Sequence, residues 1–296
     1  YEIIKCDWSS DVCSSDLAVV AQQQQEQKAA QQQQVQQQAA AAAQQALPVF
    51  TPAPGRDLKV DSPLYEAVFH TGGGALRSFK LKQYQTGLAA DSPLVNLVDP
   101  QTAAVAPLGL VINSQPSWST GQWSVENAEN GLKIGQGQQG VLRFDGEVDN
   151  LRVVREMTFN ADTYLISEKI RVVNTTDQAR SVRVSYTVAA DASNAAGDRY
   201  DAMRLAWDND GSLGEESSPK TLESTGSLVT GKIYWAGTMS TYFLAAVLPG
   251  DINNVTVKGR MQQNVFRAAV EEPEVMLGPG QERELTVSYW LGPKER

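Results

Sequence analysis

Histidine and cysteine are almost absent from this chain, and each scarcity removes a class of functional site. The 296 residues contain one histidine, His70, and two cysteines, Cys6 and Cys13, both close to the first residue. A single imidazole excludes most histidine-based metal sites and most acid–base catalysis that depends on histidine. The long cysteine-free remainder is compatible with any compartment, including an oxidising one, where stray thiols are a liability.

Long apolar runs and an excess of positive charge are missing as well. No apolar run is long enough to span a membrane. Lys and Arg total 25 against 34 Asp and Glu, a net charge of −9 that argues against nucleic acid as a partner. Phosphate-binding loops, dinucleotide fingerprints, nucleophile elbows and zinc-ligand spacings do not occur. We therefore predict no enzymatic activity, no cofactor and no metal site.

The first 57 residues differ in composition from the rest of the chain. Residues 1–17 match neither a signal peptide nor a helix, and we interpret them as a non-native or artefactual leader. Residues 18–57 are rich in Gln and Ala and then in Pro. Because this segment has no apolar stripe to bury, it predicts a solvated tether, with a coiled-coil or prion-like segment as the alternative. Residues 58–296 are predicted to form the folded domain.

The most informative local pattern is a glycine turn between two alternating runs. Within residues 60–84, apolar and polar side chains alternate on both sides of Gly72-Gly73-Gly74. A period of two is typical of strands with one buried face. Because glycine tolerates positive φ, the three glycines allow the two runs to fold back as a hairpin.

Similar alternation recurs along the rest of the domain. Residues 151–159, 164–172 and 182–188 are separated by short polar turns, which predicts an antiparallel meander with one buried face. Residues 191–230 are predicted to form long loops with one or two short strands, and residues 236–239 a helical turn. No crossover helices separate the strands, which argues against a parallel sheet. We predict an all-β fold, a large antiparallel β-sandwich with little helix.

Aromatic residues and the lone histidine are the first candidates for a site. His70 stands at a strand end, and a structural role is favoured over catalysis because no orienting partner lies nearby in sequence. Trp118 and Trp123 flank a loop and are candidates for stacking on a sugar ring. Trp235 and Trp290 lie in or beside apolar strands, where packing in the core or on the sheet surface explains them better.

Acidic residues are concentrated between residues 191 and 220. Their spacing matches no EF-hand loop, so a solvated loop is favoured over a calcium site. Long loops in compact domains often carry function, so we predict that this segment is a surface for a protein partner. The predicted surface consists of Asp198, Asp201, Asp208, Asp210, Glu215 and Glu216.

Three motifs in order along the chain resemble the periplasmic domain of the YidC family of bacterial inner-membrane protein insertases. The resemblance covers residues 58–296, and the Gln- and Ala-rich tether is typical of the family's N-terminus as well. The matching residues are Glu66, Phe69, Thr71, Gly73, Gly74, Phe79, Leu81 and Tyr84, then Tyr234, Trp235, Met239, Tyr242, Phe243 and Pro249, then residues 289–294.

The resemblance implies a β-supersandwich related to galactose mutarotases, located in the periplasm and tethered to the inner membrane. The parent protein would be anchored in the membrane, whereas this region would be soluble. The implied role is non-catalytic help in inserting and folding inner-membrane proteins, alone or with the Sec translocon. The implied partners are Sec accessory subunits and nascent inner-membrane proteins. The alternative is a carbohydrate-binding β-sandwich, which would need exposed aromatic side chains on a concave sheet.

Overall fold

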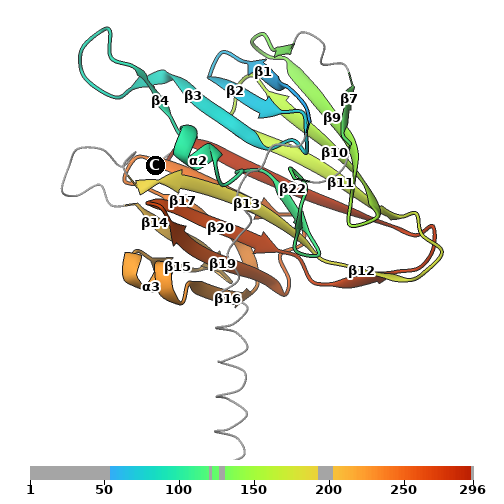
Figure 1. Cartoon of the computed structure of the whole chain (residues 1–296). Coiled ribbons are helices and arrows are strands. Elements are labelled where there is room, and N and C mark those ends of the chain that lie inside the picture. Colours follow the sequence, from blue (N-terminus) through green and yellow to red (C-terminus); the bar gives the residue numbers. More distant parts are fainter. Residues whose placement is uncertain (1–53, 120–121, 127–130, 193–202, 295–296) are drawn as a thin grey trace, which may run out of the picture. The chain divides into compact units, whose positions relative to one another are not determined.

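Strands in two layers make up the described part of the chain. The computed structural model describes residues 54–119, 122–126, 131–192 and 203–294, which belong to one compact unit, Ala46–Arg296. The predicted leader and most of the predicted tether lie outside the described residues. One layer is a nine-stranded sheet, and a five-stranded and a six-stranded sheet form the other (Figure 1). The predicted all-β sandwich with little helix is confirmed.

The nine-stranded sheet is antiparallel throughout and has the order β15-β14-β17-β18-β22-β11-β10-β9-β7. Its strands are β7 (Ser124–Glu126), β9 (Gln139–Val148), β10 (Leu151–Asn160), β11 (Leu165–Asn174), β14 (Arg204–Asn209), β15 (Ser212–Glu216), β17 (Ile233–Met239), β18 (Phe243–Pro249) and β22 (Glu282–Pro293).

The two smaller sheets pack on the same face of the nine-stranded sheet. The five-stranded sheet consists of β4 (Leu94–Asn96), β3 (Leu76–Gln85), β2 (Tyr65–His70), β1 (Asp57–Asp61) and β8 (Leu132–Lys133) in that order. The six-stranded sheet consists of β16 (Ser227–Gly231), β19 (Val255–Gln262), β20 (Val265–Glu271), β13 (Val184–Asp191), β5 (Leu110–Ile112) and β6 (Gln115–Pro116). Phe69 stacks edge-on against Phe159 across one interface, with 5.5 Å between ring centroids. In the other interface, β13 and β20 pack against β17 and β18.

Helix is confined to two short segments, α2 (Pro100–Ala103) and α3 (Pro219–Ser224). Each begins with a proline, and Asp99 and Ser218 cap the respective first turns by accepting backbone N–H groups. In the part of the chain that the structure describes, no helix is long and apolar enough to cross a bilayer.

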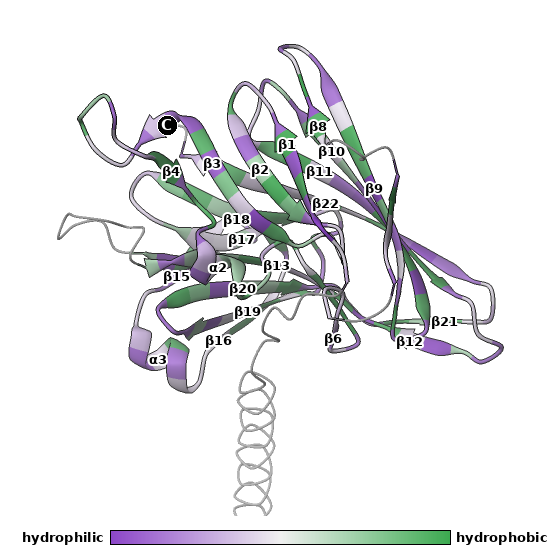
Figure 2. Cartoon of the chain, turned by 45° about the horizontal axis from the view of Figure 1, so that its top comes forward, coloured by the Kyte–Doolittle hydropathy of each residue, from purple (hydrophilic) through white to green (hydrophobic). Residues whose placement is uncertain are grey.

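The predicted glycine-turn hairpin is confirmed as β2 and β3, which pair antiparallel. Tyr65, Phe69 and Phe79 point into the core and are fully buried, as the alternation predicts. Figure 2 shows hydrophilic and hydrophobic residues alternating along β1, β2 and β9. The turn needs its glycines, because Gly73 and Gly74 have φ of 84° and 69°.

The predicted three-strand meander is only partly correct. β10 and β11 pair antiparallel, but β11 then pairs with β22 rather than with the strand that follows it in sequence. The short strand β12 (Arg180–Val182) pairs with β21 (Val275–Leu277), and β13 continues into the six-stranded sheet. There β13 is buried along its whole length, so neither of its faces is exposed to solvent.

Two other predictions from sequence are wrong. Residues 236–239 are the end of β17, not a helical turn, because they pair with β14 on one side and β18 on the other. The described part of the segment 191–230 contains β14, β15, α3 and β16 rather than long loops. Its Asp, Ser, Gly and Asn residues reflect tight turns between short strands, such as Asp210-Gly211, where both residues have positive φ.

Candidate functional site

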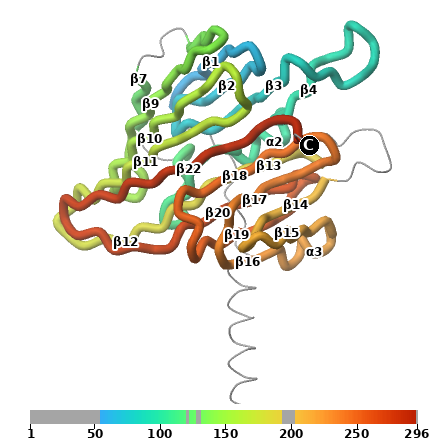
Figure 3. Tube along the Cα trace, turned by 180° about the vertical axis from the view of Figure 1, so that it is seen from behind, coloured from blue at the N-terminus to red at the C-terminus, as the bar shows by residue number. Residues whose placement is uncertain are grey.

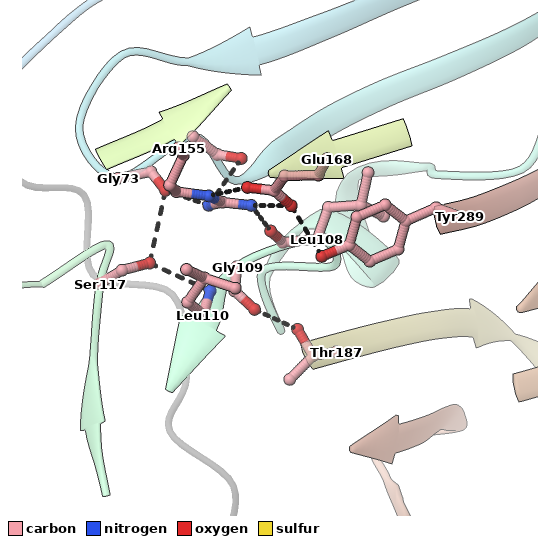
Figure 4. A network of polar contacts seen from close by, with 10 residues as sticks. Gly73, Leu108, Gly109, Leu110, Ser117, Arg155, Glu168, Thr187 and Tyr289 are labelled. Carbon is pink, nitrogen blue, oxygen red and sulfur yellow. Dashed lines mark hydrogen bonds and ion pairs between the residues drawn. The ribbon is translucent and has the colours of Figure 1, made fainter. Parts of the chain in front are cut away.

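A buried ion pair joins the layers of the sandwich. Arg155 on β10 and Glu168 on β11 are both fully buried, and Nε of Arg155 lies 2.6 Å from Oε1 of Glu168. The Arg155 guanidinium also donates to the carbonyl of Gly73 at 2.5 Å and to that of Leu108 at 2.7 Å. The hydroxyl of Tyr289, on β22, donates to Glu168 Oε2 at 2.9 Å (Figure 4).

This network is structural rather than catalytic. Burial by itself lowers the pKa of Arg155, but the charge and hydrogen bonds of Glu168 outweigh it and leave the pKa raised. Glu168 therefore holds the Arg155 guanidinium as a cation. Because the guanidinium bonds the glycine turn and the loop before β5, it fastens both segments to the nine-stranded sheet. No face of the pair reaches solvent, so a substrate has no access to it.

The positions of Arg155 and Glu168 within their strands carry a sequence signal for this pair. Arg155 has the same parity as the buried residues Val153 and Met157, and Glu168 has the same parity as Ile166 and Ile170. When opposite charges occupy buried-face positions of two successive strands, they indicate a buried ion pair, because neither ion is stable there alone.

A second buried carboxylate, Glu272, makes folding stability depend on pH. It is 2% exposed and accepts a hydrogen bond from the Tyr186 hydroxyl at 3.1 Å, while Arg283 lies 3.5 Å away. Burial raises the pKa of Glu272 above its ordinary value of 4.5, and Arg283 opposes this only in part. The folded state therefore holds the proton more tightly than the unfolded state does.

We expect the variant Glu272→Gln to change this pH dependence in one direction. The contribution of Glu272 to stability is fully present below pH 4.5 and is lost as the pH rises through its raised pKa. The free energy of unfolding of the wild type should therefore fall relative to that of the variant over this interval. Urea unfolding of both proteins at several pH values measures this change, and a wild type that gains stability relative to the variant as the pH rises would contradict the assignment.

His70 has the structural role that the sequence favours. The side chain is 7% exposed, and its Nδ1 accepts the backbone N–H of Gly72 at 3.1 Å. The imidazole thus supports the glycine turn from within.

The predicted sugar-stacking role is wrong for Trp118. This side chain is fully buried, its ring lies against Gly109, and the guanidinium carbon of Arg267 lies 5.6 Å from the ring centroid. Burial lowers the pKa of Arg267 to about 9, so the group is still a cation at neutral pH and suits the π-face of the indole. Neither face of Trp118 is open to a ligand.

Trp123 is half-buried, and part of its side chain is already in contact with other residues of the domain. Its indole N–H donates to the carbonyl of Ser117 at 2.9 Å, and its ring packs over Gly146, where a Cβ would lie 2.3 Å from the ring. The structure does not bring Trp118 and Trp123 together as two walls of a ligand site. Stacking at Trp123 stays a prediction.

Four of the six predicted acidic surface residues lie on a hairpin rather than a long loop. Asp198 and Asp201 fall outside the described residues, whereas the other four belong to β14, β15 and the turn between them. Glu215 pairs with Arg204 at 3.2 Å and Asp210 with Lys232 at 3.2 Å. In the described part of the chain, no three His, Cys, Asp or Glu residues are arranged to hold a metal. The partner surface that Asp208, Asp210, Glu215 and Glu216 were predicted to form stays a prediction.

The outer face of the nine-stranded sheet carries a feature that the sequence did not reveal. Residues that pair across antiparallel strands share a face. The register therefore places Ala206, Gly237, Ala246, Trp290 and Leu165 in one row across β14, β17, β18, β22 and β11. The same parity puts Trp235, Met239, Leu244 and Leu248 on either side of this row. Figure 3 shows β14, β17, β18 and β22 side by side.

These residues form an apolar half of an otherwise charged face. The large side chains are half-buried, whereas Ala206 and Ala246 are 1% exposed and form the floor between them. On the other half of the face, ion pairs such as Arg152–Asp145, at 2.6 Å, occupy β9 and β10. The outer apolar patch, as we call it, consists of Leu165, Ala206, Trp235, Gly237, Met239, Leu244, Ala246, Leu248 and Trp290.

A hollow opens at one end of the sandwich, between β4 and the adjacent ends of β17 and β18. Its volume is about 270 Å³, and none of the side chains that line it within the described residues is charged. Beside it, the rings of Tyr84 and Phe243 pack edge to face, with 5.5 Å between their centroids. The end hollow, as we call it, is lined by Gln85, Thr86, Val95, Asn96, Leu97, Ala190, Met203, Thr238, Ser240, Tyr242, Phe243, Leu244 and Ala245.

Comparison with known sequences identifies similar proteins. A family model described as the YidC periplasmic domain matches residues 57–296. The membrane protein insertase YidC of Nitratidesulfovibrio vulgaris (strain Miyazaki F) is 49% identical over 84% of this chain and 46% of that protein. The protein of the same name from Lawsonia intracellularis is 40% identical over 84% of this chain and 46% of its own length. The chain thus spans about half the length of the curated relatives it matches.

Comparison with solved structures shows the fold. A galactose mutarotase-like protein from Lactobacillus casei has a TM-score of 0.53 and 10% identity, over 80% of this chain and 100% of that one. A putative aldose 1-epimerase from Escherichia coli has a TM-score of 0.50 and 9% identity, over 81% of this chain and 99% of that one. The expected galactose-mutarotase-like sandwich is confirmed, and identities this low carry no information on activity.

Proposed function

The chain belongs to the YidC periplasmic domain family, and from this we propose that it is a non-catalytic contact domain of a membrane protein insertase. Membership places it in the periplasm as part of an inner-membrane protein. Its proposed work is to hold partner proteins while the parent protein inserts and helps to fold inner-membrane proteins, alone or with the Sec translocon.

The outer apolar patch is the observation that carries this proposal. Contiguous apolar surface bounded by polar residues is typical of protein interaction sites. Trp235, Trp290 and Leu248 are side chains of the kind that dominate the centres of interfaces, either as aromatic anchors or as aliphatic packing around them. Because they stand on paired strands of a large sheet, the patch keeps its shape when a partner binds and loses little conformational entropy.

The predicted acidic surface adjoins this patch. Glu215 is the cross-strand partner of Ala206, and Asp208 is the partner of Trp235, so both carboxylates lie on the same face as the patch. An apolar centre with a charged border is the usual anatomy of a transient protein interface. We propose that the partners are nascent inner-membrane proteins or Sec accessory subunits, with the acidic hairpin selecting a basic segment beside an apolar one.

The carbohydrate-binding alternative is not favoured. It depended on two exposed aromatic platforms, and Trp118 is buried. Catalysis of the epimerase type needs a histidine paired with a carboxylate, and the lone His70 bonds the glycine turn instead.

A charged residue in the patch tests the proposal. In the full-length insertase, the variant Leu248→Lys should lower the yield of site-specific photocrosslinks from position 235 to partner proteins about thirtyfold, since a charge buried at the centre of an apolar interface costs about 2 kcal/mol or more. The matched control is Ser167→Lys. Residue 167 shares the outer face and is exposed, but its cross-strand neighbours, Thr158 and Ser288, are polar.

Two results would decide whether the patch contacts partners, and a third measurement is the control. Adducts with nascent membrane proteins or Sec subunits that disappear in Leu248→Lys and persist in Ser167→Lys support a contact domain. Equal yields in both variants would contradict it. Far-ultraviolet circular dichroism of the two variants confirms that a loss of crosslinks is not a loss of fold.

A further inference from the structure

The end hollow has the chemistry of a site for one uncharged group. The lining side chains in the described part of the chain are all neutral, so they offer a charged ligand no compensation for its desolvation. Its volume of about 270 Å³ lies just below the range of about 300–1,000 Å³ typical of small-molecule sites. A single large side chain suits this size better than an extended small molecule does.

One buried hydroxyl in the hollow has no partner. Thr238 is 1% exposed, and its Oγ1 makes no hydrogen bond within the described part of the chain. The register pairs Thr238 with Leu205 and Ala245, both buried, so its side chain points inward between the layers. An unpaired buried hydroxyl destabilises the fold, and a ligand with a matching polar atom would remove that cost.

The rim of the hollow is suited to an extended chain. β4 is the last strand of its sheet, and its edge away from β3 pairs with no strand among residues 54–119, 122–126, 131–192 and 203–294. Val95 on this strand lines the hollow, and Tyr242 stands at the opposite rim, 65% exposed. A free strand edge beside a side-chain pocket is the arrangement by which β-strand addition recognises peptides.

We propose that the end hollow binds the side chain of a tyrosine or tryptophan in an extended polypeptide that lies along β4. These side chains combine an apolar ring with a hydrogen-bonding tip, and the tip would pair with Thr238 Oγ1. Tyr and Trp are concentrated at the ends of membrane-spanning segments. The inference rests on the proposed function only where it names an unfolded membrane protein as the source of that side chain.

Peptides that differ by one hydroxyl test the pairing with Thr238. The probe is a short, uncharged, fluorescently labelled Ser/Thr peptide with a central Tyr, Phe or Ser, titrated into the 296-residue chain and followed by anisotropy. The Tyr peptide should bind about fivefold more tightly than the Phe peptide, as expected for one net hydrogen bond. The isosteric variant Thr238→Val should abolish this ratio, whereas Thr238→Ser, which keeps the hydroxyl, should retain it.

Several outcomes would overturn the inference. Equal affinity for the Tyr and Phe peptides, a Tyr preference that survives in Thr238→Val, or no binding of the Tyr peptide at about 1 mM each would do so. Displacement of the Tyr peptide by free galactose would assign the hollow to a sugar instead. Leu244 belongs to both the hollow and the patch, but these results depend on Thr238, so failure here and failure of the Leu248 crosslinking experiment are separate findings.

Discussion

Replacing Arg155 by methionine is expected to lower the free energy of unfolding by about 3–5 kcal/mol, the usual cost of leaving one member of a buried ion pair alone. The variant leaves the Glu168 carboxylate fully buried and bonded to the Tyr289 hydroxyl, without its ionic partner. It also deprives the carbonyls of Gly73 and Leu108 of the guanidinium that bonds them. Chemical denaturation followed by tryptophan fluorescence measures the loss.

Two controls separate burial from charge. Arg152, on the same strand, pairs with Asp145 on the exposed face, so Arg152→Met should leave the unfolding midpoint almost unchanged. The double variant Arg155→Met with Glu168→Leu should be more stable than Arg155→Met alone, because it no longer buries an unpaired carboxylate. If the double variant is the less stable of the two, the cost arises from the lost bonds to Gly73 and Leu108 and not from the charge.

Substituting Gly73 by alanine is expected to cost about 2–5 kcal/mol, from two sources that add. Its φ of 84° strains any residue with a Cβ, at about 1–2 kcal/mol. The new Cβ would also lie 2.5 Å from the carbonyl oxygen of Ser117, a backbone atom that cannot rotate away, and overpacking of this kind costs about 1–3 kcal/mol.

Gly137 provides the matched comparison for Gly73. Its φ is 71°, but a Cβ there meets nothing within 4 Å. Gly137→Ala therefore carries the conformational strain without the clash and should cost only about 1–2 kcal/mol. Thermal unfolding of the two variants gives the difference directly. Equal losses would show that the loop around Ser117 yields to the extra methyl group.

Local patterns were sufficient to predict the hairpin of β2 and β3, because both of its strands and its turn lie within one short segment. Local patterns failed at β13, where Ser185 and Thr187 alternate with apolar residues and so suggested a solvent-exposed face. Those two polar side chains are buried, and they are satisfied by the Glu271 carboxylate and by the carbonyls of Ala106 and Gly109. Such bonds join residues roughly eighty positions apart, which no window on the sequence contains.

The outer apolar patch was beyond sequence analysis for a related reason. Trp235 and Trp290 were both recognised as sheet residues, but which face they share depends on the register between β17, β18 and β22. A shift of one residue in any pairing would move a whole strand's side chains to the other face. Thr238 was hidden in the same way, since its inward orientation follows from that register and not from its neighbours in sequence.

The central position of β22 also has a mechanical consequence. Its twelve residues are bonded to β11 on one side and to β18 on the other, and Lys294 just after it bonds the carbonyls of Tyr242 and Ser240. Antiparallel ladder bonds run perpendicular to the strand, so a pull along β22 loads all of them in shear at once rather than one by one. The strand is thus built to bear tension, and force applied at Lys294 would be spread across the nine-stranded sheet before any single bond yields.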